Sequence, residues 1–158
     1  MTYKITIYTD GASRGNPGPG GFGYILIWGK HRKEGSKGFR LTTNNRMELL
    51  AVIEALEAIK KENCDITVYC DSKYVVDAIE KKWLQAWIQK GFKKTKNPDL
   101  WIRYLEAAKN HQVRFVWIKG HNHDPFNEKC DEMAVQASNQ PDLEIDNGYE
   151  HADQENLF

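Results

Sequence analysis

The feature of this sequence that most limits its fold is the order of its strand and helix patterns. Three strand-like segments come first, at about residues 3–9, 21–28 and 31–41. Two more, DITVYC (65–70) and VRFVWI (113–118), alternate with helical segments. Because strands joined through helices run parallel with right-handed crossovers, we predict an α/β fold. Its sheet is mixed and five-stranded, with three antiparallel strands, then parallel ones, and helices on both faces.

Helical periodicity fills the segments between the later strands. Apolar residues repeat at helical spacing from Leu49 to Ile59. Gly91 is a stop signal, and two Asx-Pro pairs open helices, because Asn or Asp caps a helix and proline suits its first turn. The expected helices span residues 44–61, 72–90 (one or two helices), 97–110 and 124 onward.

Length and composition indicate one ordinary domain. The chain has 158 residues and three cysteines, an odd number that favours a reducing, cytoplasmic setting. We expect no signal peptide and no membrane association, since no apolar run approaches the roughly 18 residues of a membrane span. Residues 1–141 are predicted to form the domain, and the acidic residues 142–158, with little apolar content, a loose tail.

Glycines follow the first strand and match a nucleotide-binding pattern. Gly18, Gly20 and Gly23 spell G-x-G-x-x-G, which requires a helix immediately after the glycines. The residues that follow, FGYILIW, are instead typical of a strand. We therefore interpret the segment as a hairpin and expect no dinucleotide.

Four acidic residues stand where strands end or helices begin. Asp10 and Asp71 each follow a predicted strand, Glu48 lies in the first turn of one helix, and Asp131 in the second turn of another. Each has an alternative role as a turn residue, a helix cap or a partner of the helix dipole. If the first and fourth strands are parallel neighbours, however, all four carboxylates reach one edge of the sheet.

Clustered carboxylates indicate divalent cations, because they raise one another's pKa values unless a cation intervenes. All-oxygen ligands favour Mg²⁺, with Mn²⁺ as a substitute, and two such ions about 4 Å apart can activate water and stabilise a departing alkoxide. His121 is placed to shuttle protons. A zinc site of His121, His123 and Cys130 is an alternative, although it lacks a fourth ligand.

The zero net charge conceals a polarised chain. Residues 81–96 hold six lysines and no acid, whereas residue 130 onward holds eight acids and no Lys or Arg. The basic segment indicates an anionic partner, and a solvated surface helix is the alternative. Trp83 and Trp87 within it suit either nucleic-acid contact or core packing.

Five blocks of the sequence, in order and at matching intervals, resemble bacterial-type ribonuclease HI. They are YTDGASRGNPGPGG, TTNNRMELLAVIEAL, YCDSKYVV, DLW and WIKGHNHDPFNEKCDEMA, and the similarity covers about residues 3–149. The resemblance implies a monomeric endonuclease that hydrolyses the RNA strand of RNA–DNA hybrids. It further implies two-metal-ion catalysis that leaves 5′-phosphate and 3′-hydroxyl ends.

The resemblance also implies roles for individual residues. Asp10, Glu48, Asp71 and Asp131 would bind two metal ions, and His121 would assist proton transfer. The lysine-rich segment corresponds to the family's basic protrusion, which grips the DNA strand, and Lys73 stands where glutamine is common. The implied substrate-binding residues are Asn16, Thr43, Asn44, Asn45, Lys73, Trp83, Lys90, Lys93 and Lys94.

Overall fold

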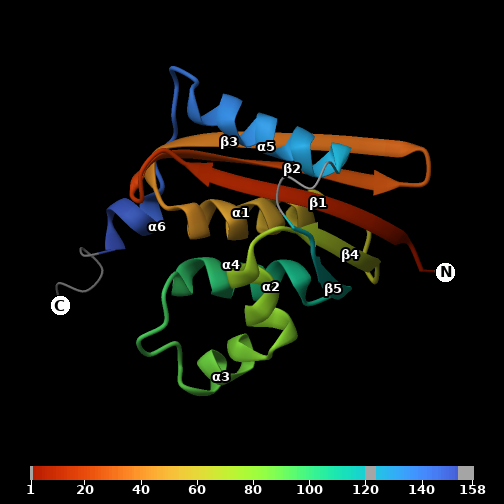
Figure 1. The fold of residues 1–158 in the computed structure, drawn as a ribbon. Helices are drawn as coiled ribbons and strands as arrows, with labels where there is room; N and C mark the ends of the chain where they lie inside the picture. The colour runs from red at the N-terminus through yellow and green to blue at the C-terminus, as the bar shows by residue number, and fades with distance from the viewer. Residues whose placement is uncertain (1, 120–123, 153–158) are drawn as a thin grey trace.

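A five-stranded sheet forms the centre of the protein (Figure 1). The computed structural model describes residues 2–119 and 124–152. The strands lie in the order β3-β2-β1-β4-β5; β1 to β3 pair antiparallel, and β4 runs parallel to both β1 and β5. The predicted fold class is therefore confirmed. The strands are β1 (Lys4–Ser13), β2 (Gly18–Trp28), β3 (His31–Thr42), β4 (Asp65–Cys70) and β5 (Gln112–Trp117).

Helices cover both faces of this sheet. In Figure 1, α5 (Pro125–Ser138) crosses one face above β1 to β3, and α1 (Asn44–Glu57) lies on the other side with α2 to α4. Among the described residues, no helix combines the length and apolarity needed to cross a membrane. The remaining helices are α2 (Lys73–Glu80), α3 (Trp83–Gln89), α4 (Pro98–Ala108) and the single turn α6 (Asn147–Glu150).

The core lies mainly between α1 and the sheet. Met47 and Ile53 of α1 are fully buried, as are Ile7 of β1 and Val68 of β4. On the opposite face α5 packs directly on the backbone of β2, where a Cβ at Gly21 would lie 2.4 Å from the carbonyl oxygen of Ala134. Glycine is therefore required there for a helix to approach the sheet so closely.

The β1–β2 hairpin confirms the interpretation of the glycine-rich segment. Gly18, Gly20 and Gly23 all lie within β2, and no helix follows them. Both strands extend farther than predicted, since antiparallel pairing continues to Ser13↔Gly20. As a consequence, Asp10 lies inside β1 rather than after its end.

The helices are shorter than their hydrophobic patterns predicted. α1 ends at Glu57 instead of residue 61. The segment 72–90 contains two helices, because Lys82 adopts a left-handed conformation with φ 62° between them. Gly91, with φ 63°, follows α3 closely, in agreement with the predicted stop.

Residues 142–152 pack against the domain, which corrects the predicted loose tail over this range. Glu144 extends the edge of the sheet, because its N–H donates to the carbonyl of Gly38 at 2.9 Å and its carbonyl accepts from the N–H of Arg40, also at 2.9 Å. The low apolar content of this segment predicted a loose tail, whereas backbone pairing with β3 holds it against the sheet.

A buried ion pair fastens the same segment to α1. Asp146 accepts hydrogen bonds from Nε of Arg46 and from the hydroxyl of Thr42, each at 2.7 Å. The guanidinium of Arg46 also donates to both carboxylate oxygens of Asp99, at 2.9 and 2.7 Å. Arg46 thereby joins α1, α4 and the C-terminal segment at one point.

Candidate functional site

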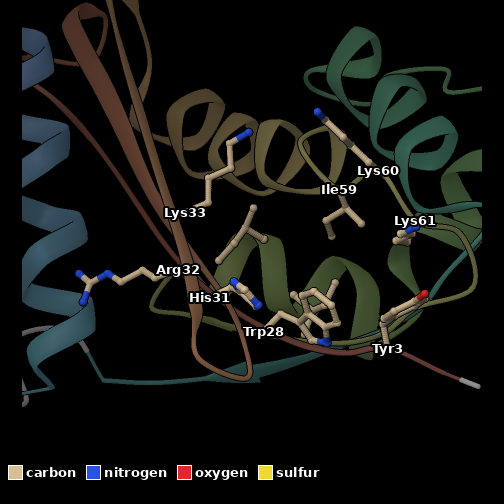
Figure 2. A pocket seen from close by; sticks show the side chains of 10 residues that line it. Tyr3, Trp28, His31, Arg32, Lys33, Ile59, Lys60 and Lys61 are labelled. Atoms are coloured by element: carbon tan, nitrogen blue, oxygen red, sulfur yellow. The ribbon is translucent and has the colours of Figure 1, made fainter.

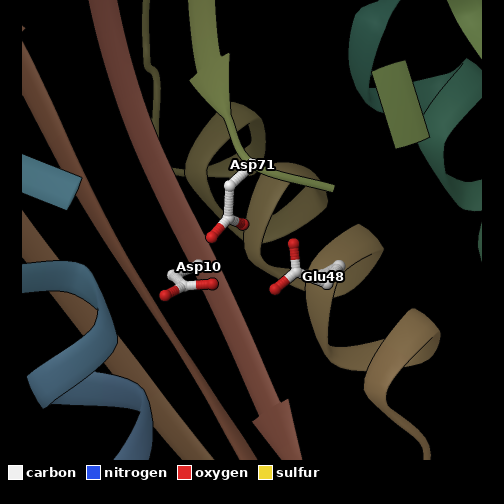
Figure 3. Close-up of side chains that lie close together, drawn as sticks. All are labelled: Asp10, Glu48 and Asp71. Atoms are coloured by element: carbon white, nitrogen blue, oxygen red, sulfur yellow. The ribbon is translucent and has the colours of Figure 1, made fainter. Parts of the chain in front are cut away.

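Three carboxylates from distant parts of the chain converge at one edge of the sheet (Figure 3). One oxygen from each of Asp10, Glu48 and Asp71 lies within 4.8 Å of the others. The sheet register explains this meeting, because parallel pairing between β1 and β4 ends at Thr9↔Cys70. The next residue on each chain is an aspartate, so the two carboxyl groups emerge side by side, and Glu48 approaches from α1.

Gly11 allows α1 to approach β1 closely enough to complete this cluster. Its N–H donates to Oε1 of Glu48 at 2.6 Å and to Oδ1 of Asp10 at 2.9 Å. A Cβ at this position would lie 2.4 Å from the backbone nitrogen of Glu48. Glycine is therefore required here, and its amide orients two of the three acids.

Other residues cap the helices, which excludes the alternative roles of Glu48 and Asp71 as helix caps. Thr43 caps α1 by accepting from the N–H of Arg46 at 3.3 Å, and Glu48 lies in the second turn rather than the predicted first. Ser72, not Asp71, caps α2. Asp124 caps α5, as the sequence predicted.

Burial dominates the electrostatics of the cluster. Asp10 and Glu48 are only 6% and 3% exposed. Burial raises the pKa of Asp10 to about 7, with the negative charges of Asp71 and Asp131 adding to the rise and the hydrogen bond with Glu48 opposing it. Burial and the neighbouring Asp10 also raise the pKa of Glu48 well above its usual value.

One oxygen of this cluster has no protein partner. Oε2 of Glu48 is buried and makes no hydrogen bond within the described part of the chain. A buried carboxylate oxygen without a donor is unfavourable, and a cation bound at the cluster would satisfy it. The all-oxygen character of the site matches a hard divalent ion.

The carboxylates open onto a cleft of about 610 Å³. Asp131 of α5 lines it and adds negative charge near Asp10, but it does not belong to the group of three within 4.8 Å. Asn44 and Asn45, at the start of α1, form another part of its wall. The cleft thus brings together all four predicted acids and two of the predicted substrate-binding amides.

Lys73 and Trp117 form a second wall of the cleft. The ammonium group of Lys73 lies 4.6 Å from the ring centre of Trp117, whose Nε1 donates to the carbonyl of Asp71 at 3.1 Å. Trp117 was not among the site residues predicted from the sequence. Trp117 of β5 pairs with Cys70 of β4, and Cys70 directly precedes Asp71. This pairing places Trp117 at the same edge of the sheet as Asp71.

Asn16 links the hairpin turn to the start of α1. Its Oδ1 accepts from the N–H of Asn44 at 3.1 Å, and Thr43, the cap of α1, precedes Asn44 directly. Asn44 and Asn45 line the cleft beside the carboxylates, and Asn16 and Thr43 lie next to Asn44. The predicted group of Asn16, Thr43, Asn44 and Asn45 is close together in the structure.

The lysine-rich segment, residues 81–96, comprises α3 and the residues on either side of it (Figure 1), and none of its residues lines the cleft. Trp83 is 43% exposed, with the ammonium group of Lys81 lying 5.6 Å from its ring centre. Trp87 instead packs against Trp101 of α4, with ring centres 5.6 Å apart. The two tryptophans therefore have different roles, one at the surface and one in the core. The predicted substrate contacts in this segment do not line the cleft; they are Trp83, Lys90, Lys93 and Lys94.

The predicted His121 lies outside the described residues, as does His123 of the alternative zinc site. The third residue of that alternative, Cys130, is buried, and its thiol donates to the carbonyl oxygen of Tyr8 at 3.4 Å. Burial also raises the pKa of this thiol, which disfavours the thiolate that zinc requires.

Comparison with known sequences identifies closely similar proteins. The family model described as RNase H matches residues 2–139. A ribonuclease H of Syntrophus aciditrophicus is 52% identical over 151 residues, which cover 92% of this chain and 87% of that protein. A ribonuclease H of Desulforamulus reducens is 53% identical over 148 residues, with 90% and 92% covered.

Solved structures share the fold. The crystal structure of LC9-RNase H1, a type 1 RNase H with the type 2 active-site motif, matches with a TM-score of 0.79 and 31% identity over 87% of this chain and 73% of that one. LC11-RNase H1 in complex with an RNA/DNA hybrid matches with a TM-score of 0.62 and 29% identity, covering 84% of this chain and 95% of that one.

Proposed function

Because this chain belongs to the ribonuclease H family, we propose that it hydrolyses the RNA strand of RNA–DNA hybrids at the cluster of Asp10, Glu48 and Asp71. The observation that carries the proposal is the meeting of three carboxylate oxygens within 4.8 Å at the floor of an open cleft. The hybrid-bound structure of its relative LC11-RNase H1 supports the substrate.

The site fits divalent metal ions, with Mg²⁺ as the physiological ion and Mn²⁺ as a substitute. Asp10, Glu48, Asp71 and Asp131 would hold two ions. The partnerless Oε2 of Glu48 and the raised pKa values of the buried pair support a bound cation. When bound, such ions supply a water of lowered pKa and stabilise charge on the leaving 3′-oxygen.

The protein residues around the cluster position the hybrid. The amide side chains of Asn16, Asn44 and Asn45 can donate to and accept from the ribose 2′-hydroxyl, the group that distinguishes RNA from DNA. The N–H of Gly11 fixes the orientation of Asp10 and Glu48 before substrate arrives, which reduces reorganisation during the reaction. The cleaved strand ends in a 5′-phosphate and a 3′-hydroxyl.

The remaining predicted residues bind the backbone of the hybrid or assist proton transfer. Thr43 and Lys73 contact backbone phosphates, and His121 assists proton transfer, a role supported by the family resemblance alone. Trp83, Lys90, Lys93 and Lys94 hold the DNA strand through phosphate charge and an exposed ring.

We also propose that the enzyme is a monomer in a reducing cytoplasm. The monomeric state rests on the family resemblance. The reducing compartment is supported by Cys64, Cys70 and Cys130, which are all free and buried, so that the domain has no disulfide among its described residues. Thiols of this kind are typical of proteins kept in reducing compartments.

A cleavage assay on end-labelled duplexes tests the function. With Mg²⁺, we expect the RNA strand of an RNA–DNA hybrid to be cut, while double-stranded DNA and double-stranded RNA stay intact. Asp10→Asn should abolish cleavage and retain hybrid binding, whereas Glu106→Gln, an equivalent carboxylate-to-amide change on the exposed face of α4, should leave cleavage unchanged. Substantial turnover by Asp10→Asn at saturating Mg²⁺ would contradict the proposal, and hybrid binding without cleavage by the unaltered protein would indicate a non-catalytic binding module.

A further inference from the structure

A tryptophan borders the cleft without belonging to the hydrophobic core. Trp117 ends β5, which lies at the edge of the sheet, and its side chain is 42% exposed. It is neither one of the buried core residues nor one of the partly buried side chains packed against them. Because hydrophobic stabilisation scales with the apolar area that is buried, burial explains little of the placement of this residue.

Two contacts fix the indole of Trp117 beside the carboxylate cluster. Its Nε1 donates to the carbonyl oxygen of Asp71 at 3.1 Å, which ties the ring to the backbone of one of the acids. Strand pairing supports this tie, since the N–H of Ile118 donates to the carbonyl of Cys70 at 3.0 Å. The ammonium group of Lys73 lies 4.6 Å from the ring centre, within the roughly 6 Å of a cation–π contact. The backbone thus holds the ring, and the ring holds the ammonium group.

Lys73 is the one cation among the described residues that line the cleft, whereas four of the other lining residues are acids. It nevertheless forms no ion pair within the described part of the chain. A lysine on a flexible four-carbon stem, two residues after Asp71, would be expected to turn toward these carboxylates. Its place in the first turn of α2 offers no favourable alternative, because the helix dipole repels a cation there. The contact with Trp117 therefore accounts for where the ammonium group lies.

We propose that Trp117 is a positioning residue that keeps Lys73 away from the metal-binding carboxylates. A neutral ring attracts an ammonium group without cancelling its charge, whereas a carboxylate partner would cancel it. Lys73 therefore stays available for a phosphate of the hybrid, and the carboxylates stay available for metal ions. The consequence for the hybrid rests on the proposed function, but the consequence for the acids does not.

Calorimetric titration with Mn²⁺ alone, without hybrid, tests the consequence for the acids. Trp117→Leu removes the ring, so that Lys73 pairs with the carboxylates and competes with the metal. We expect the affinity for Mn²⁺ to fall by about two- to fivefold, the range of one partly exposed ion pair. The double variant Trp117→Leu, Lys73→Gln should bind Mn²⁺ as Lys73→Gln does, because no ammonium group is left to compete.

Fluorescence anisotropy with a labelled RNA–DNA hybrid tests the consequence for the substrate. All variants are made in the Asp10→Asn background, so that the RNA strand is not cut. Trp117→Leu should weaken hybrid binding by about two- to fivefold and reduce the slope of log affinity against log salt by roughly 0.7–0.9. When Lys73→Gln is also present, the same change should have no further effect. Trp117→Phe keeps a ring face and should retain most of the affinity.

Trp28→Leu is the matched control for the loss of an exposed ring. Trp28 ends β2, is 46% exposed and does not line the cleft. Its replacement should change neither the Mn²⁺ affinity nor the hybrid affinity. Thermal unfolding checks that each variant is folded. If Trp117→Leu unfolds, Trp117→Met takes its place, because it also removes the ring and leaves a longer apolar chain.

Four results would overturn the proposal. They are unchanged affinities in Trp117→Leu, equal losses in Trp117→Leu and Trp28→Leu, a loss that persists when Lys73→Gln is present, and equal losses in Trp117→Phe and Trp117→Leu. The third would assign the ring a direct contact with the hybrid or a purely structural role, and the fourth would assign the effect to the N–H anchor. Cleavage by the unaltered protein is scored separately: its absence would count against the proposed function, and the Mn²⁺ titration would still decide the consequence for the acids.

Discussion

Replacing Asp10 by asparagine is expected to stabilise the metal-free protein near neutral pH, although it removes a residue of the site. Burial raises the pKa of this carboxyl to about 7 from its usual 3.8. At pH values between 3.8 and about 7, the Asp10 carboxyl keeps its proton in the folded state but has released it in the unfolded state. The stability of the unaltered protein therefore falls as the pH rises through this window, and the asparagine variant lacks that loss.

The structure sets the size of the effect. The difference between 3.8 and 7 corresponds to about 4 kcal/mol at about 1.36 kcal/mol per pH unit. The asparagine amide must still be buried beside Glu48, which costs roughly 1–3 kcal/mol. The net increase in the free energy of unfolding at pH 8 is then about 1–3 kcal/mol, or roughly 2–12 °C in Tm for a domain of this size.

Urea and thermal unfolding in EDTA, at pH 8 and pH 4, measure this difference. Asp10→Asn should be more stable than the unaltered protein at pH 8, and its advantage should vanish at pH 4, where the carboxyl is protonated in the folded state. Glu106→Gln, at an exposed position on α4, should show neither effect. A variant that is less stable at pH 8, or a difference that does not change with pH, would contradict a raised pKa at Asp10.

Three further substitutions probe the supports of the site. Gly11→Ala should lower the cleavage rate at least tenfold, because its Cβ would lie 2.4 Å from the nitrogen of Glu48; an unchanged rate in a labelled-hybrid assay would count against this role. Arg46→Met should reduce the free energy of unfolding by about 3–5 kcal/mol, as measured in urea, because it leaves Asp146 buried without its cation; a loss below 1 kcal/mol would argue against the network. Lys73→Gln should weaken hybrid binding and reduce the slope of log affinity against log salt by roughly 0.7–0.9, as one phosphate contact would; an identical slope excludes that contact.

Local sequence patterns predicted the parts of the structure that depend on neighbouring residues. The alternation of strands and helices correctly predicted a mixed sheet whose later strands run parallel, because strands joined through crossover helices run parallel. Asp10 and Asp71 could be placed together because both follow the last paired residues of adjacent strands. Asp124-Pro125 predicted the start of α5 correctly, since a cap acts within one turn.

Features that depend on distant contacts were not predictable in the same way. The buried pair of Arg46 and Asp146 joins residues 100 positions apart, so composition around Asp146 indicated a loose tail where the structure shows packing. Glu48 acts from the second turn of α1 because Gly11 admits the helix, and neither residue signals the other locally. A cavity lined by Tyr3, Trp28 and Ile59 likewise combines the start of β1, the β2–β3 hairpin and the segment after α1 (Figure 2).

The most direct test of the central claim is anomalous diffraction from crystals soaked in Mn²⁺. We expect an anomalous peak within coordination distance, about 2.0–2.3 Å, of carboxylate oxygens from Asp10, Glu48 and Asp71. In Asp10→Asn crystals soaked in the same way, that peak should be weaker or absent. Strong Mn²⁺ peaks elsewhere, with none between these three residues, would contradict a metal-dependent catalytic site at this edge of the sheet.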